Sequence, residues 1–302
     1  MRIPKGSQFM MLSMLFSVLN GRSVKMLSHI PVAEVLFFSS LGPLVAIIIT
    51  LWYRRISMWG QRRSLLLYRS MIGNLSIVLY FVTLQQQHIS LPSAITLHNT
   101  APIFAALLGI FMVQEPVRLQ QWFFFVLSFA GVILINGFSL TSASWYVFIG
   151  LGSAFCKGLA NNIIRKTEHK ERTLVMTFYS YLVSVLLSCT YLLYDFVILQ
   201  GQDLLMLGAI SVLGYTAHYC AIKAYQLGPV TPVSATAYIA IIYAFLLNYL
   251  SCLFLGDALP QLRLLELLGA GLVLLGIFLN IFIGKKAGLA KHCKVEYHGR
   301  TQ

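Results

Sequence analysis

Apolar residues along this chain fall into long runs that short polar connections separate. A membrane helix needs about 20 predominantly apolar residues, because ~1.5 Å of rise per residue must cross ~30 Å of hydrocarbon. Ten segments meet this requirement: residues 8–27, 33–53, 67–86, 91–113, 119–138, 144–165, 174–197, 204–224, 230–253 and 264–284. The pattern predicts an all-α integral membrane protein with ten transmembrane helices. The first run is read as a membrane helix and not as a cleaved signal, because no small-x-small site follows it.

The basic residues gather on one predicted side of this bundle. With ten spans both termini face the same side, and the side richer in lysine and arginine is the cytoplasm. The opposite side receives Arg22, Lys25 and Arg263, and Lys157 falls within a span. The terminal side receives 18 basic residues: Arg2, Lys5, Arg54, Arg55, Arg62, Arg63, Arg69, Arg118, Arg165, Lys166, Lys170, Arg172, Lys223, Lys285, Lys286, Lys291, Lys294 and Arg300. Both termini are therefore predicted to be cytoplasmic.

This distribution decides how the composition is interpreted. Of the 302 residues 58% are hydrophobic and only 10% charged, whereas a soluble domain carries about 25% charged residues. The positive-inside pattern accounts for the net charge of +13 without a nucleic-acid partner. Residues 285–302 form a basic cytoplasmic tail that can touch anionic lipid. The five cysteines have no Cys-x-x-Cys spacing, so we expect no disulfide framework, no metal site and no cofactor.

The apolar pattern repeats along the chain. Residues 89–94 (ISLPSA) return 141 positions later as residues 230–235 (VTPVSA), and residues 111–115 (FMVQE) return as residues 253–257 (LFLGD). A repeat of five helices, an odd number, places the second copy upside down in the membrane. We therefore expect two inverted repeats, over residues 8–138 and 144–284. Alternating-access carriers have this architecture, with their site near the midplane between the halves.

The same segments resemble the drug/metabolite transporter superfamily, in its ten-helix type with two EamA-like repeats. The first half carries the pattern of the family's fourth helix, with small residues at its start, a mid-helix proline and a closing glutamate: Leu91-Pro92-Ser93-Ala94, Pro102-Ile103-Phe104 and Phe111-Met112-Val113-Gln114-Glu115. Further matches are Lys25, Pro31, Glu34, Gly131, Gly269 and Gly276. The chain departs from the family at three places: Ser39 and Ser40 stand where an arginine is common, no proline occurs near Ala244, and Asp257 replaces a glutamate.

The resemblance implies a secondary carrier for a small organic solute, amino-acid-like or related, in the cell (inner) membrane. The solute's own gradient, protons or a counter-solute would drive it, and a monomer is compatible with this mechanism. Two alternatives stay open: uptake of S-adenosylmethionine or another large charged metabolite, and a lipid flippase or non-transporting membrane protein. An enzyme is disfavoured, because the chain has no phosphate loop, no His-Glu-x-x-His pair and few acidic residues in the predicted spans.

Basic residues inside the predicted spans are the first candidates for a substrate site, since a charge in hydrocarbon needs a cavity or a partner. Arg22 and Lys25 share a helix face. They could hold a substrate carboxylate or phosphate, or they snorkel to the outer interface or pair with Glu34. Lys157, with Asn161 one turn beyond it, either lines the cavity or donates to helix-end carbonyls.

Histidine and tyrosine supply the remaining candidates. His98 and Asn99 precede Pro102, which removes a backbone hydrogen bond and kinks the helix. An imidazole there binds substrate, carries a proton or is a buried hydrogen-bonded group. His218 is its counterpart in the second half. Three tyrosines inside spans either stack on substrate or pack between helices with satisfied hydroxyls: Tyr80, Tyr238 and Tyr243.

Overall fold

The computed structural model describes residues 4–86, 89, 91–114, 119–136, 144–167, 171–192 and 201–255, with a few positions between 268 and 279. Over these residues the chain forms helices and no strand. The tenth predicted span and the basic tail therefore lie outside the described residues, apart from those few positions. Glu115 and Asp257, which close the matched segments of the repeat, lie outside them as well.

The helices follow the predicted spans closely. The first half contains α1 (Lys5–Met26), α2 (Val32–Tyr53), α3 (Arg63–Gln85), α4 (Leu91–His98), α5 (Ala101–Met112) and α6 (Leu119–Asn136). The second half contains α7 (Ser144–Thr167), α8 (Thr173–Leu192), α9 (Gly201–Leu227), α10 (Val230–Thr236) and α11 (Ile239–Leu255). The predicted boundary at residues 228–229 separates α9 from α10.

Six described helical segments are long and apolar enough to cross a membrane: Val32–Tyr53, Arg63–Gln85, Trp145–Thr167, Thr173–Thr190, Gly201–Leu227 and Val230–Leu247. They make the chain a multi-pass membrane protein. Ten spans are predicted, and the difference has physical causes. α1 has the length of a span, but Asn20, Arg22 and Lys25 lower its hydropathy. The fourth predicted span is divided between α4 and α5. The fifth counts only as a shorter apolar helix, Leu119–Gly131, and the tenth lies outside the described part of the chain.

The fourth predicted span breaks at Asn99 and Thr100, between α4 and α5. The Thr100 N–H bonds to the Leu97 carbonyl, three residues back, at 3.2 Å. Pro102 follows, and because proline has no N–H it leaves the His98 carbonyl without its helical donor. This break is the kink that the sequence predicts.

The ninth predicted span also breaks, although its pattern predicts one continuous helix over residues 230–253. The break lies at Ala237 and Tyr238, between α10 and α11. Both N–H groups bond three residues back, to the carbonyls of Ser234 and Ala235 at 2.9 and 3.3 Å. No proline causes this break, so the sequence carried no signal for it, and the prediction of a single helix is corrected.

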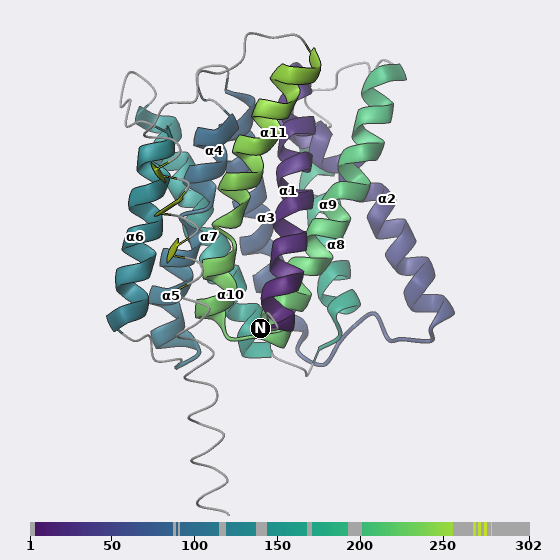
Figure 1. Ribbon diagram of the computed structural model, residues 1–302. Helices are drawn as coiled ribbons and strands as arrows, with labels where there is room; N and C mark the ends of the chain where they lie inside the picture. Colours follow the sequence, from purple (N-terminus) through teal and green to yellow (C-terminus); the bar gives the residue numbers. More distant parts are fainter. Residues whose placement is uncertain are drawn as a thin grey trace, which may run out of the picture.

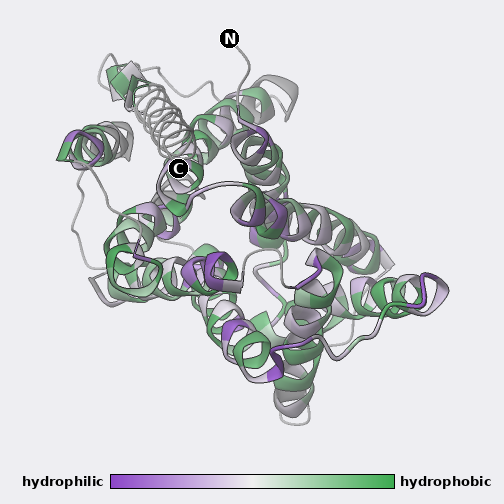
Figure 2. Ribbon diagram, turned by 90° about the horizontal axis from the view of Figure 1, so that it is seen from below, coloured by the Kyte–Doolittle hydropathy of each residue, from purple (hydrophilic) through white to green (hydrophobic). Residues whose placement is uncertain are grey.

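The helices pack in pairs that join the two halves of the chain. α1 packs mainly on α9, α3 on α7 and α2 on α8, and α5 packs on α7 and α10. Figure 1 shows the long helices side by side, with α10 near the N-terminus and α11 continuing away from it. Seen end-on, hydrophilic stretches lie among the helices in the middle of the view (Figure 2). Exposed apolar side chains cover outer positions such as Ile49, Phe111 and Val212.

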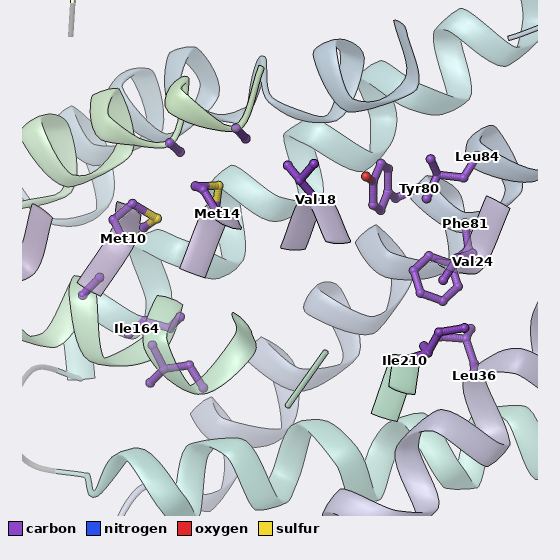
Figure 3. Close-up of a cluster of buried hydrophobic side chains, with 14 of the residues drawn as sticks. Met10, Met14, Val18, Val24, Leu36, Tyr80, Phe81, Leu84, Ile164 and Ile210 are labelled. Carbon is purple, nitrogen blue, oxygen red and sulfur yellow. The ribbon is translucent and has the colours of Figure 1, made fainter. Parts of the chain in front are cut away.

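One large cluster of buried apolar side chains holds the bundle together. Met10, Met14 and Val18 follow one another along α1 and lie in this cluster with Tyr80 of α3 and Ile210 of α9 (Figure 3). Their spacing of four residues places them on one face of α1. The cluster thus fixes α1 between α3 and α9, beside the polar groups described next.

Candidate functional site

A polar cavity of about 180 Å³ lies among α1, α2, α3, α4, α7, α8 and α9, so both halves of the chain line it. On each long helix the lining residues stand mostly three or four positions apart, so they share one face of that helix. On α3 they are Arg69, Gly73, Ser76 and Tyr80, among others. Seven serines and three asparagines belong to the lining. A cavity of roughly 150 Å³ holds a benzene molecule, so this one can take a small organic compound.

The charge of the lining is one-sided. Arg69 and Lys157 are the arginine and the lysine of the described lining, which also includes His98 and His218 and contains no aspartate or glutamate. In the described part of the chain, no ion pair within 4.0 Å joins Arg69 or Lys157 to a carboxylate, and the pair of His29 with Asp203 lies outside the lining.

Arg69 lies on α3 and is 4% exposed. Its Nη1 donates to the hydroxyl of Ser180 on α8. Asn74 supports the same contact, since its Nδ2 donates to the Ser180 carbonyl at 2.8 Å and to the Ser70 carbonyl at 2.9 Å. The Nε of Arg69 is buried and has no hydrogen-bond partner among the described residues. Ser180 thus holds the Arg69 guanidinium in place, and the Nε–H group remains available to a further acceptor.

Lys157 lies on α7 and reaches the break between α4 and α5. Its Nζ is 3.4 Å from Oδ1 of Asn99, a long hydrogen bond. The neighbouring His98 Nδ1 lies 2.7 Å from the hydroxyl of Ser153 on α7. The His98 ring stacks on Tyr80 of α3, with centroids 4.1 Å apart and planes at 18°. The break is therefore held against two helices beside the cavity.

The second half supplies two further polar groups. Asn161 donates to the Tyr225 hydroxyl at 2.8 Å, and that hydroxyl lies 3.1 Å from the Ser234 hydroxyl. These contacts connect α7, α9 and α10. His218 of α9 lies edge-on to Tyr181 of α8, with centroids 5.8 Å apart. Its buried Nε2 has no hydrogen-bond partner in the described chain.

Five of the ten candidate residues line the cavity: Tyr80, His98, Lys157, Asn161 and His218. The structure places the other five outside its lining. Asn99 lies beside the cavity, since its Oδ1 accepts the long hydrogen bond from Lys157. Arg22 is half-buried on α1. Lys25 donates to the Ile89 carbonyl at 2.7 Å, which is a structural contact near the end of α1.

The remaining two candidates are tyrosines that pack between helices. Tyr238 is 1% exposed in a small apolar cluster with Ala106, Phe125 and Ile241. Its aromatic body fits that cluster, while its hydroxyl has no partner among the described residues. Tyr243 is half-buried against the large cluster.

The sequence reasoning missed Arg69, which it counts among the cytoplasmic charges. The sequence offered no clear signal, because Arg69 lies only two residues inside the predicted third span, which begins at residue 67. α3 begins at Arg63, four residues before the predicted start of the third span, so Arg69 lies nearly two turns inside the helix. The lining serines were missed as well, although Ser180 and Ser184 stand one turn apart on α8.

Membrane transporters are bundles of membrane-crossing helices with a polar site inside, as found here. The chain belongs to the EamA-like transporter family, whose model matches residues 4–137 and again residues 144–282. This membership in the drug/metabolite transporter superfamily agrees with the resemblance found in the sequence. It indicates a transporter and not an enzyme, with a small-molecule solute as its partner.

The relatives carry transporter names. The chain is 28% identical over 236 residues to the pseudopaline exporter CntI of Pseudomonas aeruginosa, covering 76% of this chain and 81% of that protein. It is 24% identical over 217 residues to an uncharacterized transporter of Helicobacter pylori, covering 69% and 70%. One solved crystal structure superposes with a TM-score of 0.72 at 16% identity, over 93% of this chain and 97% of that one, which shows the fold.

Proposed function

We propose that this protein is a secondary carrier that moves a small organic metabolite by alternating access through the polar cavity. The observation that carries the proposal is the lining of that cavity from both halves of the chain. Polar and charged side chains inside a membrane bundle are costly unless they face a cavity or a partner, and such sites in carriers lie near the midplane between repeats.

The proposal includes ten spans in two inverted repeats, 8–138 and 144–284, with both termini cytoplasmic in the inner membrane. Two observations support the repeats. The family model matches the chain twice, in consecutive segments. The helix pairs are also related: if each half contributes five spans, α1 on α9 corresponds to α7 on α3, and α2 on α8 corresponds to itself. Alternating access would move one half against the other across these helix pairs.

Transport into proteoliposomes tests the proposal. A panel of labelled metabolites, amino acids included, is offered with and without an imposed pH gradient. Saturable uptake of one solute is expected. It should be abolished in Gly73→Leu, because Gly73 lines the cavity and has only Ala160, at 3.9 Å, near its Cβ position. Gly208→Leu is the control, since its Cβ position has no neighbour within 4 Å.

Two outcomes contradict the carrier. In the first, monodisperse protein moves no solute of the panel, either with or without the imposed pH gradient. In the second, the protein moves fluorescent lipid between leaflets while soluble solutes stay out, which would assign it to the flippases instead.

A further inference from the structure

We propose that the cavity binds its substrate as an organic anion, with a carboxylate held between Arg69 and Lys157. This inference rests on the carrier function proposed above and names the substrate class of the same site.

The charge of the cavity is unbalanced. Burying a cation costs free energy unless an opposite charge or a full set of hydrogen bonds compensates it. Arg69 has one side-chain partner, the Ser180 hydroxyl, and a buried Nε left over. Lys157 has one long contact, to Asn99. A bound anion would supply the compensation that the lining residues lack.

The two cations lie at nearby levels of the contact between α3 and α7. α3 and α7 touch where Ser76 donates to the Ser153 carbonyl at 2.7 Å and where Gly73 faces Ala160. Lys157 lies between Ser153 and Ala160, so it is level with residues near Asn74. Arg69 is about five residues farther along α3, or ~7 Å of helix rise. One small anion can span this distance or lie between the two charges.

The side chains around the cavity match the chemistry of a carboxylate. A guanidinium offers planar paired donors that match a carboxylate, and a lysine ammonium adds a point charge. The serines around them offer hydroxyl donors to the remaining oxygens. His98 and His218 each place a ring beside the cavity. A positively charged solute such as S-adenosylmethionine would meet two cations here, so this lining does not favour that alternative.

The test measures binding directly, with three small probes of similar length. Succinate carries two carboxylates, succinamide is its neutral diamide, and putrescine is a dication. The Tm of the detergent-purified full chain is followed against probe concentration. Succinate is expected to raise the Tm by about 2–4 °C at roughly five times its dissociation constant. Succinamide and putrescine should leave the Tm unchanged.

Variants assign the effect to the two cations. Arg69→Gln and Lys157→Gln should each abolish the succinate shift, and Lys157→Arg should retain it. Arg22→Gln is the control, since Arg22 is a basic residue outside the cavity lining. Equal shifts with all three probes, or a succinate shift that survives both glutamine variants, would overturn the proposal. The probe comparison in the wild type decides the question even where a variant does not fold.

The two proposals fail separately. Anion binding without transport of any solute would sustain the anion site and remove the carrier. Transport of a neutral or cationic solute, with no succinate shift, would sustain the carrier and remove the anion site.

Discussion

Ser40 of α2 and Ser184 of α8 meet across the two halves of the chain, with their side-chain oxygens 2.8 Å apart. Both residues are buried and line the cavity. They are separated by 144 positions, close to the 141-residue spacing of the repeated sequence segments. The contact therefore joins similar places in the two proposed repeats, beside the space through which substrate would pass.

The connection between α2 and α3 is fastened by Glu171. Its carboxylate accepts the backbone N–H groups of Gln61 and Arg62 at 2.6 and 2.7 Å. Glu171→Ala should release this connection and speed trypsin cleavage at its arginines, Arg54, Arg55, Arg62 and Arg63. Limited digestion with mass spectrometry measures the rate and the site. Glu171→Gln keeps an acceptor oxygen and should resemble the wild type; equal rates for alanine and wild type would refute the role.

The close approach of α7 to α5 depends on Gly158. A Cβ there would lie 2.8 Å from the Ala105 nitrogen and 3.0 Å from Phe104 Cβ. Gly158→Ala should therefore destabilise the protein by about 1–3 kcal/mol, the usual cost of overpacking. Gly208→Ala, in open space on α9, should be neutral or gain up to about 1 kcal/mol from helix propensity. Thermal unfolding in detergent compares the two, and an unchanged Gly158→Ala would contradict the packing.

The Tyr225 hydroxyl is predicted to stabilise the contact of α7, α9 and α10. Tyr225→Phe removes the acceptor of Asn161 and the neighbour of Ser234, both of which are buried. Leaving buried polar groups unpaired costs about 1–3 kcal/mol, so the Tm should fall by on the order of 2 °C or more. Tyr68→Phe is the control, because Tyr68 is 64% exposed. If both variants melt alike, the hydroxyl contributes nothing to stability.

Much of the architecture was predictable because lipid imposes long apolar runs. The ends of α2 and α9 agree with their predicted spans within a few residues, and Pro102 marks the break after α4. The break at Ala237 and Tyr238 was not predictable, because no proline or glycine stands at it or just after it.

The site was predictable only in part. A buried lysine or histidine stands out in an apolar run, so Lys157, His98 and His218 could be chosen from the sequence. Arg69 follows a basic cluster at the membrane surface, and only the start of α3 at Arg63 shows that it lies inside. Arg22 and Tyr238 look equally suitable in the sequence. On α1 the neighbouring Gly21 lines the cavity and Arg22 does not, and Tyr238 lies between α10 and α11, which contribute no residue to the lining.

Crosslinking Ser40 to Ser184 tests the central claim, that solute passes as the two halves move against each other. Ser40→Cys and Ser184→Cys are combined in a chain whose five native cysteines are replaced by alanine. The 2.8 Å contact between the serine oxygens places the new thiols within reach of a disulfide. The account predicts that oxidation forms this disulfide and reduces transport to the rate of empty liposomes. Reduction should restore transport, while each single variant transports alike under both conditions. If the fully crosslinked protein transports as fast as the same protein without the disulfide, alternating access between these halves is contradicted.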